Sequence, residues 1–224
     1  GVTFTAQPGE VTAIIGGTGS GKSTLVGLIP RFYDVAAGRV LVDGVDVRDM
    51  SQDTLRAKIG YVPQKAVLFM GTVATNIRFG REEASDDEVK RAAAIAQASE
   101  FIDQKPEGYG APVAQGGTNL SGGQKQRLAI ARALVRNAEI YVFDDSFSAL
   151  DFATDSRLRA ALKTETAGAT VFIVSQRIGT VMNADRIVVL DNGRVAGIGT
   201  HDELVRTCEV YREIAESQAS LEVA

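Results

Sequence analysis

Short runs of apolar residues alternate along this chain with longer segments whose apolar residues recur every three or four positions. Unbroken apolar runs of strand length are typical of strands buried on both faces of a parallel sheet. These runs predict strands over residues 11–15, 60–62, 140–143 and 170–174. The helical spacing predicts helices over residues 23–29 and 125–136, and another that begins at a capping box formed by Ser85 and Glu88. Strands that alternate with helices indicate an α/β fold with a mostly parallel sheet.

Two β-hairpins are predicted in addition to the parallel strands. The first centres on Asp43-Gly44 within residues 40–47, and Asp-Gly between alternating residues is the strongest short hairpin signal. The second joins residues 186–190 to 194–198 through a short polar turn. These hairpins predict an antiparallel β edge beside the parallel sheet.

The remaining sequence is predicted to be mainly helical. A helical insertion subdomain is expected at about residues 70–135. One final helix opens with a capping box formed by Thr200 and Glu203 and is predicted to continue through Ile214. The only histidine, His201, lies in this capping segment, so we interpret it as structural rather than as a metal ligand or a base.

The composition narrows the classes of protein. Of 224 residues, 45% are hydrophobic and 23% charged, which fits a single globular domain with its own core. No apolar run approaches the ~18 residues of a membrane span. A net charge of −4 without a Lys/Arg cluster argues against nucleic acid as a partner. A lone Cys208 and the lack of a secretory segment favour a reducing setting. Because the chain begins at Gly1 rather than Met, we expect residues 1–224 to be the C-terminal part of a longer polypeptide.

A glycine-rich segment between the first strand and the first helix fits the phosphate-loop pattern G-x-x-x-x-G-K-[ST] over residues 16–23. Such glycines let consecutive backbone N–H groups form a concave nest at a helix N-terminus, which favours anions. Lys22 would add positive charge for the β- and γ-phosphates, and Ser23 and Asp144 would hold Mg²⁺. The residues predicted to bind the nucleotide here are Gly16, Gly17, Thr18, Gly19, Ser20, Gly21, Lys22, Ser23 and Thr24.

A second glycine group, residues 121–124, opens another helix. Ser121 and Gln124 form a capping box, so Gly122 and Gly123 lie at a helix N-terminus, where free N–H donors attract anions. One nucleotide rarely needs two helix N-termini from distant parts of one chain. We therefore expect the second glycine group to serve a nucleotide held by another subunit.

Both glycine groups occur in a known family: over nearly its whole length, the sequence resembles the ATPase domains of ATP-binding cassette (ABC) transporters of the exporter type. The resemblance also rests on Gln64 after an apolar strand, on the strand that ends at Asp144, and on residues 148–151. It implies that Gln64 contacts Mg²⁺ and the attacking water, and that Ser121, Gly122 and Gly123 close over a partner's γ-phosphate. It further implies that residues 148–151 lie along the dimer contact.

The same resemblance implies ATP and Mg²⁺ as cofactors, with a second ABC ATPase domain and a transmembrane domain as partners. The transmembrane domain is expected upstream of Gly1 in the same longer chain. The chain would then hydrolyse ATP to drive transport at the cytoplasmic face of the cell membrane, while the transported substrate contacts the membrane part. The adenine-stacking aromatic of the family would precede Gly1. Phe69, Met70 and Val73 suit either a docking site for the transmembrane partner or burial in the core.

Two positions depart from the family pattern, and both concern hydrolysis. Asp145 stands where the family has a Glu general base, and a displaced carboxylate loses part of the ~10²–10⁴-fold that such a base supplies. Gln176 stands where the family has a His that contacts the γ-phosphate, and an amide donates a hydrogen bond but carries no charge. Asp145, Gln64, Gln176 and Lys22 are thus the predicted catalytic residues, with weak turnover at this chain's own site. This pattern resembles the degenerate half of a heterodimeric multidrug-type exporter.

Other functions fit parts of the pattern. A symmetric homodimer would suffice if Asp145 is an adequate base. A regulatory module would hold ATP without useful turnover. A soluble, non-transport ABC ATPase would carry a coiled-coil insertion, a tandem cassette or basic patches, and a phosphate-loop kinase would leave the second glycine group unexplained. The sequence favours the transporter motor domain over these alternatives.

Overall fold

The computed structural model describes residues 1–222, with side chains up to residue 219. The strands span Val11–Gly16 (β1), Leu41–Val42 (β2), Val45–Asp46 (β3), Ile59–Val62 (β4), Gly71–Thr72 (β5), Pro112–Val113 (β6), Ile140–Asp144 (β7), Thr170–Val174 (β8), Arg186–Asp191 (β9) and Arg194–Gly199 (β10). Six of them form one sheet in the order β10-β9-β1-β8-β7-β4. All neighbours in it pair in parallel except β10, which runs antiparallel to β9 at one edge. The pairs β2-β3 and β5-β6 form small separate sheets.

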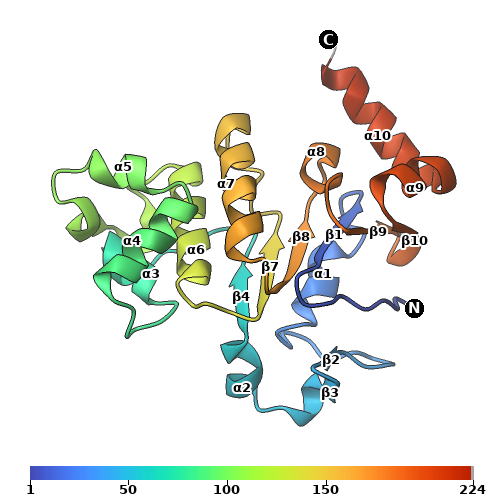
Figure 1. Cartoon of the computed structure of the whole chain (residues 1–224), viewed down its shortest axis with the longest axis horizontal. Coiled ribbons are helices and arrows are strands. Elements are labelled where there is room, and N and C mark those ends of the chain that lie inside the picture. Colours follow the sequence, from blue (N-terminus) through green and yellow to red (C-terminus); the bar gives the residue numbers. More distant parts are fainter. Residues whose placement is uncertain (223–224) are drawn as a thin grey trace.

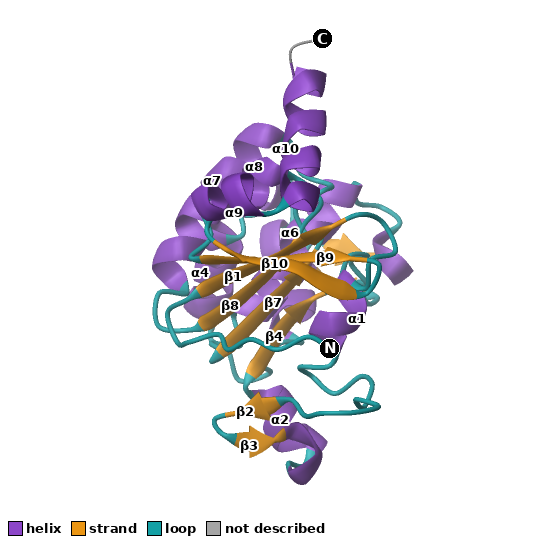
Figure 2. Ribbon diagram, turned by 90° about the vertical axis from the view of Figure 1, so that its right-hand side faces the viewer, coloured by secondary structure: helices purple, strands orange, loops and turns teal. Residues whose placement is uncertain are grey.

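Helices cover both faces of this sheet. They span Lys22–Gly27 (α1), Gln52–Ala57 (α2), Val73–Arg78 (α3), Asp86–Ile95 (α4), Ser99–Asp103 (α5), Gly122–Leu134 (α6), Phe152–Glu165 (α7), Ile178–Val181 (α8), His201–Thr207 (α9) and Glu209–Glu222 (α10). Figure 1 shows α3, α4, α5 and α6 gathered at one end of the molecule and α9 and α10 at the other. After a quarter turn, Figure 2 shows α1 on one side of the sheet and α7 and α8 on the other.

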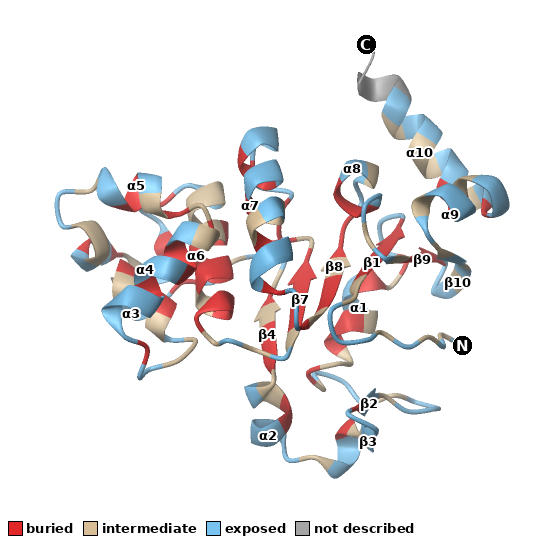
Figure 3. Ribbon diagram, in the orientation of Figure 1, coloured by how far each residue is buried: buried red, intermediate tan, exposed pale blue. Residues whose placement is uncertain are grey.

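The strands bury both of their faces, which explains their unbroken apolar runs. Successive side chains of a strand point to opposite faces of the sheet. In β1, Ile14 therefore packs in one cluster with Val26 of α1, whereas Ala13 and Ile15 belong to a cluster with α8 and α9. Figure 3 accordingly shows the central strands coloured mainly as buried.

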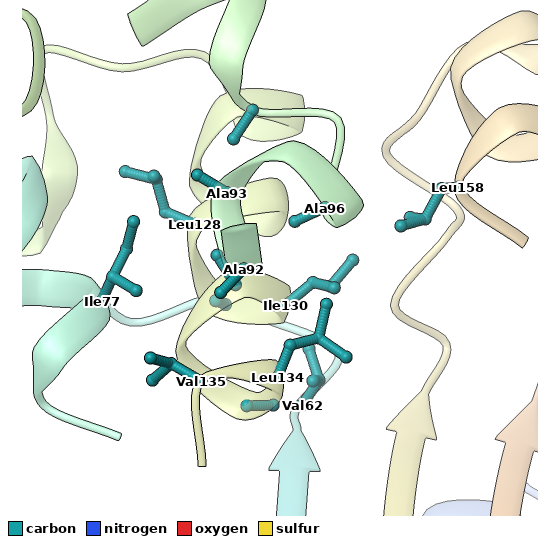
Figure 4. Close-up of a cluster of buried hydrophobic side chains, with 14 of the residues drawn as sticks. Val62, Ile77, Ala92, Ala93, Ala96, Leu128, Ile130, Leu134, Val135 and Leu158 are labelled. Atoms are coloured by element: carbon teal, nitrogen blue, oxygen red, sulfur yellow. The ribbon is translucent and has the colours of Figure 1, made fainter. Parts of the chain in front are cut away.

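A third and larger cluster joins the helices at one end of the molecule to the sheet. Leu128 and Ile130 of α6 belong to one packed group with Ile77 of α3, Leu158 of α7 and several alanines of α4. Figure 4 shows the side chains from α3, α4 and α6 gathered around α6, with Leu158 set apart on α7. This packing fixes α6 in place and leaves its first residue, Gly122, exposed at the surface.

The fold class predicted from the sequence is confirmed, as an α/β fold whose parallel sheet has an antiparallel edge. Both hairpin turns are present, with Asp43 and Asn192 in the left-handed conformation (φ 51° and 45°). The single final helix predicted through Ile214 is wrong, because Cys208 is extended (φ −118°, ψ 107°) and separates α9 from α10. The buried Cys208 side chain lies so close to Gly197 of β10 that a Cβ there would come within 3.0 Å of its Sγ. This tertiary contact holds the break between the two helices.

Candidate functional site

The residues singled out from the sequence converge at one edge of the parallel sheet. Strands β1, β4, β7 and β8 run parallel, so their carboxyl ends meet at the same edge. Gly16 ends β1, and Asp144 ends β7 and is followed by Asp145. Gln64 and Gln176 each stand two residues beyond a strand, β4 and β8 respectively. Residues far apart in the sequence thus share one surface.

Residues 16–23 connect β1 to α1, and their path depends on glycine. A Cβ on Gly16 would come within 2.2 Å of the backbone oxygen of Leu190, so no larger residue fits there. Gly21 is the N-cap of α1 and has a φ of 96°, which L side chains rarely adopt. The strand, turn and helix thus follow the order that the phosphate-loop pattern requires.

Two polar side chains are buried inside this loop. Lys22 Nζ donates hydrogen bonds to the backbone oxygens of Gly16 at 2.8 Å and Gly17 at 2.7 Å. Burial lowers the pKa of Lys22, although two nearby carboxylates act in the opposite direction. Ser20 Oγ is also buried and has no hydrogen-bond partner among the described residues. An ammonium group and an unpaired hydroxyl within a glycine-rich turn are donors suited to a bound anion.

Asp144 lies beside the loop and accepts two side-chain hydrogen bonds. Ser23 Oγ donates to Asp144 Oδ1 at 2.8 Å, and the Tyr61 hydroxyl donates to Oδ2 at 3.0 Å. Burial raises the pKa of Tyr61, and the Asp144 charge raises it further, so the phenol stays a donor. The carboxylate and the serine hydroxyl are the hard oxygen ligands that Mg²⁺ prefers. Tyr61 was missed from the sequence, because no motif marks it and only the pairing of β4 with β7 brings it here.

Asp145 contacts Gln64 across the edge of the sheet. Gln64 Nε2 donates to Asp145 Oδ2 at 3.2 Å, which joins two residues expected to act on the attacking water. Burial is the main cause that raises the pKa of Asp145, and the hydrogen bond from Gln64 opposes it. The Asp145 backbone is left-handed (φ 48°), a conformation that Asp adopts more readily than longer side chains.

Gln176 meets the phosphate loop from the end of β8. Its Oε1 accepts a long hydrogen bond, 3.5 Å, from Thr18 Oγ1. The Gln176 side chain is exposed, whereas its backbone oxygen accepts a hydrogen bond of 2.6 Å from Gln218 Nε2 of α10. Gln218 was also missed from the sequence, because it lies 42 residues away and outside every motif.

The second glycine group lies apart from the phosphate loop. Ser121 is the N-cap of α6 and forms the predicted capping box with Gln124, whose N–H donates to Ser121 Oγ at 3.2 Å. The helix begins at Gly122, earlier than the predicted range 125–136, because it starts directly after its cap. Figure 1 shows α6 and α1 on opposite sides of α7. The two glycine groups are therefore not brought together within this chain.

Residues 148–151 lie between the second glycine group and the edge of the sheet. A Cβ on Gly123 would stand 3.2 Å from the backbone oxygen of Ala149, so α6 begins directly against this segment. At its other end, Ser148 Oγ donates to the Asp145 backbone oxygen at 2.9 Å. The segment thus connects the start of α6 to the position next to Asp144.

An exposed apolar patch, made of Phe69, Met70 and Phe79, lies near α3. Their exposed fractions are 43%, 80% and 62%. The Arg132 guanidinium of α6 lies over both aromatic rings, 5.1 Å from the centre of Phe69 and 5.6 Å from that of Phe79. Burial lowers the pKa of Arg132 to about 10. Val73, grouped with Phe69 and Met70 on sequence, is fully buried instead.

Two further features lie outside this arrangement. His201 Nδ1 is 2.8 Å from the Tyr211 hydroxyl, between α9 and α10, where burial raises the pKa of Tyr211 to about 12. No helix within residues 1–222 is both long enough and apolar enough to cross a membrane.

These features define a phosphate-loop nucleotide-binding protein. A glycine-dependent turn joins a central parallel strand to a helix, and a hydrogen-bonded aspartate and serine lie beside it. The family model described as "ABC transporter" matches residues 1–148. The chain belongs to the ABC transporter family, whose ATPase domains bind ATP with Mg²⁺.

Several known proteins are similar to this chain over nearly its whole length. An ABC transporter ATP-binding protein of Mycobacterium tuberculosis is 50% identical over 221 residues, which are 97% of this chain and 38% of that protein. An ATP-dependent lipid A-core flippase of Chromobacterium violaceum is 44% identical over 220 residues, 98% of this chain and 38% of the flippase. A solved structure of a bacterial Atm1-family ABC exporter with ATP bound is 42% identical, with a TM-score of 0.94 over 98% of this chain and 38% of that one. The chain thus spans little more than a third of these relatives.

Proposed function

We propose that this chain is the ATP-binding and ATP-hydrolysing motor domain of an ABC exporter, and that it pairs with a second ABC ATPase domain around Mg-ATP. The observation that carries the proposal is the convergence at one sheet edge of the phosphate loop, Asp144, Asp145, Gln64 and Gln176. The likeness to a flippase and to an exporter with ATP bound supports the same assignment.

The phosphate loop would hold the triphosphate of ATP. Its backbone N–H groups and Lys22 would contact the phosphates, and Ser20 Oγ offers a further donor. Ser23, Asp144 and Gln64 would hold Mg²⁺, which neutralises charge that develops on the phosphates. No three His, Cys, Asp or Glu side chains gather into a metal site in the described part of the chain, so phosphate oxygens and water would complete the coordination.

The chain's own site would hydrolyse ATP slowly. Asp145 would take a proton from the attacking water while Gln64 holds the carboxylate in place. The raised pKa of Asp145 strengthens it as a base, but its carboxylate reaches one methylene less far than that of Glu. Gln176 would donate a hydrogen bond to the γ-phosphate without the charge that an imidazolium supplies. Both changes affect turnover and leave the residues that hold ATP unchanged.

The second glycine group would serve the nucleotide of the partner. It lies at the exposed start of α6, where the first N–H groups of a helix have no partner within the helix. Residues 148–151 contact both this group and Asp145, so they would connect the partner's nucleotide to this chain's own site. A partner with Glu and His at the two hydrolytic positions would then carry most of the turnover, as in a heterodimeric exporter with one degenerate site.

The apolar patch would dock the transmembrane domain. Phe69, Met70 and Phe79 are exposed, yet two of them are held by Arg132, which also donates to backbone oxygens of Val67 and Asn76 at 2.8 and 2.9 Å. A firmly held, exposed apolar patch suits a helix from a membrane partner. This docking would hold the chain at the cytoplasmic face of the membrane.

The test of the proposal is ATP binding and hydrolysis by the chain alone and with its partner cassette. The natural chain should bind Mg-ATP and hydrolyse it slowly. Combined D145E and Q176H changes should raise turnover at its own site about tenfold or more. Adding K22A to that double variant is the control and should remove the gain. Failure of the natural chain to bind ATP would overturn the motor function. Binding with no gain from the double variant would favour the regulatory module instead.

A further inference from the structure

The side-chain amide of Gln218, on the C-terminal helix α10, bonds two peptide groups that flank Arg177. Its Nε2 donates to the Gln176 backbone oxygen at 2.6 Å. Its Oε1 accepts from the Ile178 N–H at 2.8 Å. A glutamine amide has both a donor and an acceptor, so it pairs with this backbone as another peptide would. One half-buried side chain therefore fixes the backbone on both sides of a single residue.

The peptide that joins Gln176 to Arg177 has one other side-chain partner besides Gln218, because the Arg177 N–H donates to Ser175 Oγ at 3.0 Å. Helix α8 is one turn of four residues, and its N-cap, Arg177, makes no side-chain cap bond. Gln218 thus supplies a partner for one of the free N–H groups at the start of α8. Arg159 of α7 holds the segment further along, through the Gly179 oxygen at 2.9 Å. The exposed Gln176 side chain makes one long hydrogen bond within the described part of the chain, with Thr18.

Helix α10 faces the phosphate loop across an open hollow of about 300 Å³. The hollow is lined by Gly16, Gly17, Gln176, Glu213, Ile214, Ser217 and Gln218. Tyr211, fully buried near the start of α10, anchors this helix in the core cluster shared with β1 and β9. Core packing at Tyr211 thus places α10, two helical turns before Gln218.

We propose that Gln218 is a positioning residue, which directs the Gln176 side chain towards the terminal phosphate of ATP bound in this chain's own loop. The proposal rests on the proposed function, in which Gln176 contacts that phosphate. Without the Gln218 amide, the backbone at Gln176 gains freedom, and its side chain spends less time beside Thr18. Gln218 then acts on ATP only through Gln176, and it leaves the contacts to the other phosphates unchanged.

The experiment compares the affinities of the natural chain and its variants for ATPγS and for ADP, each with Mg²⁺, by isothermal titration. Only ATPγS carries a γ group, a thiophosphate that stands in for the γ-phosphate of ATP, so the ratio of the two affinities isolates contacts with that group. Q218M keeps the length of the side chain and removes both hydrogen-bonding atoms. E216M, at an exposed position of the same helix, is the matched control. Thermal unfolding of each variant checks that the chain is folded.

Q218M is expected to lower the preference for ATPγS over ADP by about threefold or more, with ADP affinity unchanged, whereas E216M leaves both affinities unchanged. Q176A should lower the preference by about tenfold, the value of a hydrogen bond to a charged group. Adding Q218M to Q176A should cause no further fall, because Gln218 acts through Gln176. This dependence separates positioning from a general structural role.

Three results would overturn the positioning role of Gln218 while leaving the proposed function standing. They are an unchanged preference in Q218M, an equal loss of affinity for both nucleotides, and the same fall in Q218M whether or not Gln176 is present. A natural chain that binds neither nucleotide would instead overturn the proposed function, and this assignment with it.

Discussion

The hydroxyl of Tyr61 offers a sharp test of how Asp144 is held for Mg²⁺. Tyr61→Phe removes the hydrogen bond of 3.0 Å to Asp144 Oδ2 and nothing else. The ring keeps its edge-to-face contact with Phe32, at 5.1 Å between ring centres. The variant therefore changes one donor atom beside a buried carboxylate.

The size of the effect follows from the charge of the acceptor. A hydrogen bond to a charged group contributes about 1.5–3 kcal/mol, and a buried carboxylate oxygen that loses its donor is left unsatisfied. For a chain of this length that corresponds to a fall of about 3–12 °C in the midpoint of thermal unfolding. Because Asp144 would also be less firmly oriented, affinity for ATP in the presence of Mg²⁺ should fall about tenfold. Since the pKa of Tyr61 is raised, the difference should not vary between about pH 6 and 9.

The assay is titration of ATP with Mg²⁺ and, separately, with excess chelator. Tyr61→Phe should weaken binding only when Mg²⁺ is present. Tyr33→Phe, at a nearby tyrosine that is 63% exposed, is the control and should change neither stability nor affinity. Equal binding by the natural chain and by Tyr61→Phe in Mg²⁺ would refute the reasoning, and so would an equal loss with and without the metal.

Three further outcomes are expected. Gly16→Ala places a Cβ within 2.2 Å of the Leu190 oxygen and should prevent nucleotide binding or folding. Gly17→Ala has open space around its Cβ and should remain folded by circular dichroism, so equal behaviour of the two variants would contradict this expectation. Burial raises the pKa of Asp145, so its charged form destabilises the folded chain above that pKa. Asp145→Asn should therefore raise the midpoint of thermal unfolding at pH 7, and this gain should disappear towards pH 4. A lower midpoint for Asp145→Asn at pH 7 would contradict this expectation. Met70→Glu should leave ATP binding by the chain unchanged but reduce co-purification with a separately expressed transmembrane domain. Undiminished co-purification would exclude the apolar patch as its docking site.

Local signals explain how much of the fold could be predicted. Apolar runs located the buried strands, and the capping boxes at Ser85, Ser121 and Thr200 are all formed in the structure. Such signals involve residues within one turn of helix or one strand, so they survive in the sequence alone. The break at Cys208 depends instead on its contact with Gly197 in another element. Helical spacing carries no information about that contact.

The same limit applies to the candidate site. The phosphate loop and the second glycine group are contiguous motifs, and the parallel strands bring Gln64 and Asp145 together as their positions after strands suggest. Tyr61 and Gln218 act across 83 and 42 residues of sequence, through a strand pairing and a helix packing that no motif records. Side chains that hold another residue in place were therefore the ones that sequence reasoning missed.

The central claim is that ATP bound to this chain's own phosphate loop is hydrolysed slowly, while the second glycine group of the chain completes a faster ATP site on a partner. The most direct measurement is steady-state ATP hydrolysis by the assembled exporter with one position of this chain changed at a time. Asp145→Asn should leave the rate within about twofold of the natural assembly, whereas Ser121→Arg should nearly abolish it. Equal losses from the two changes, or loss only in Asp145→Asn, would contradict the account.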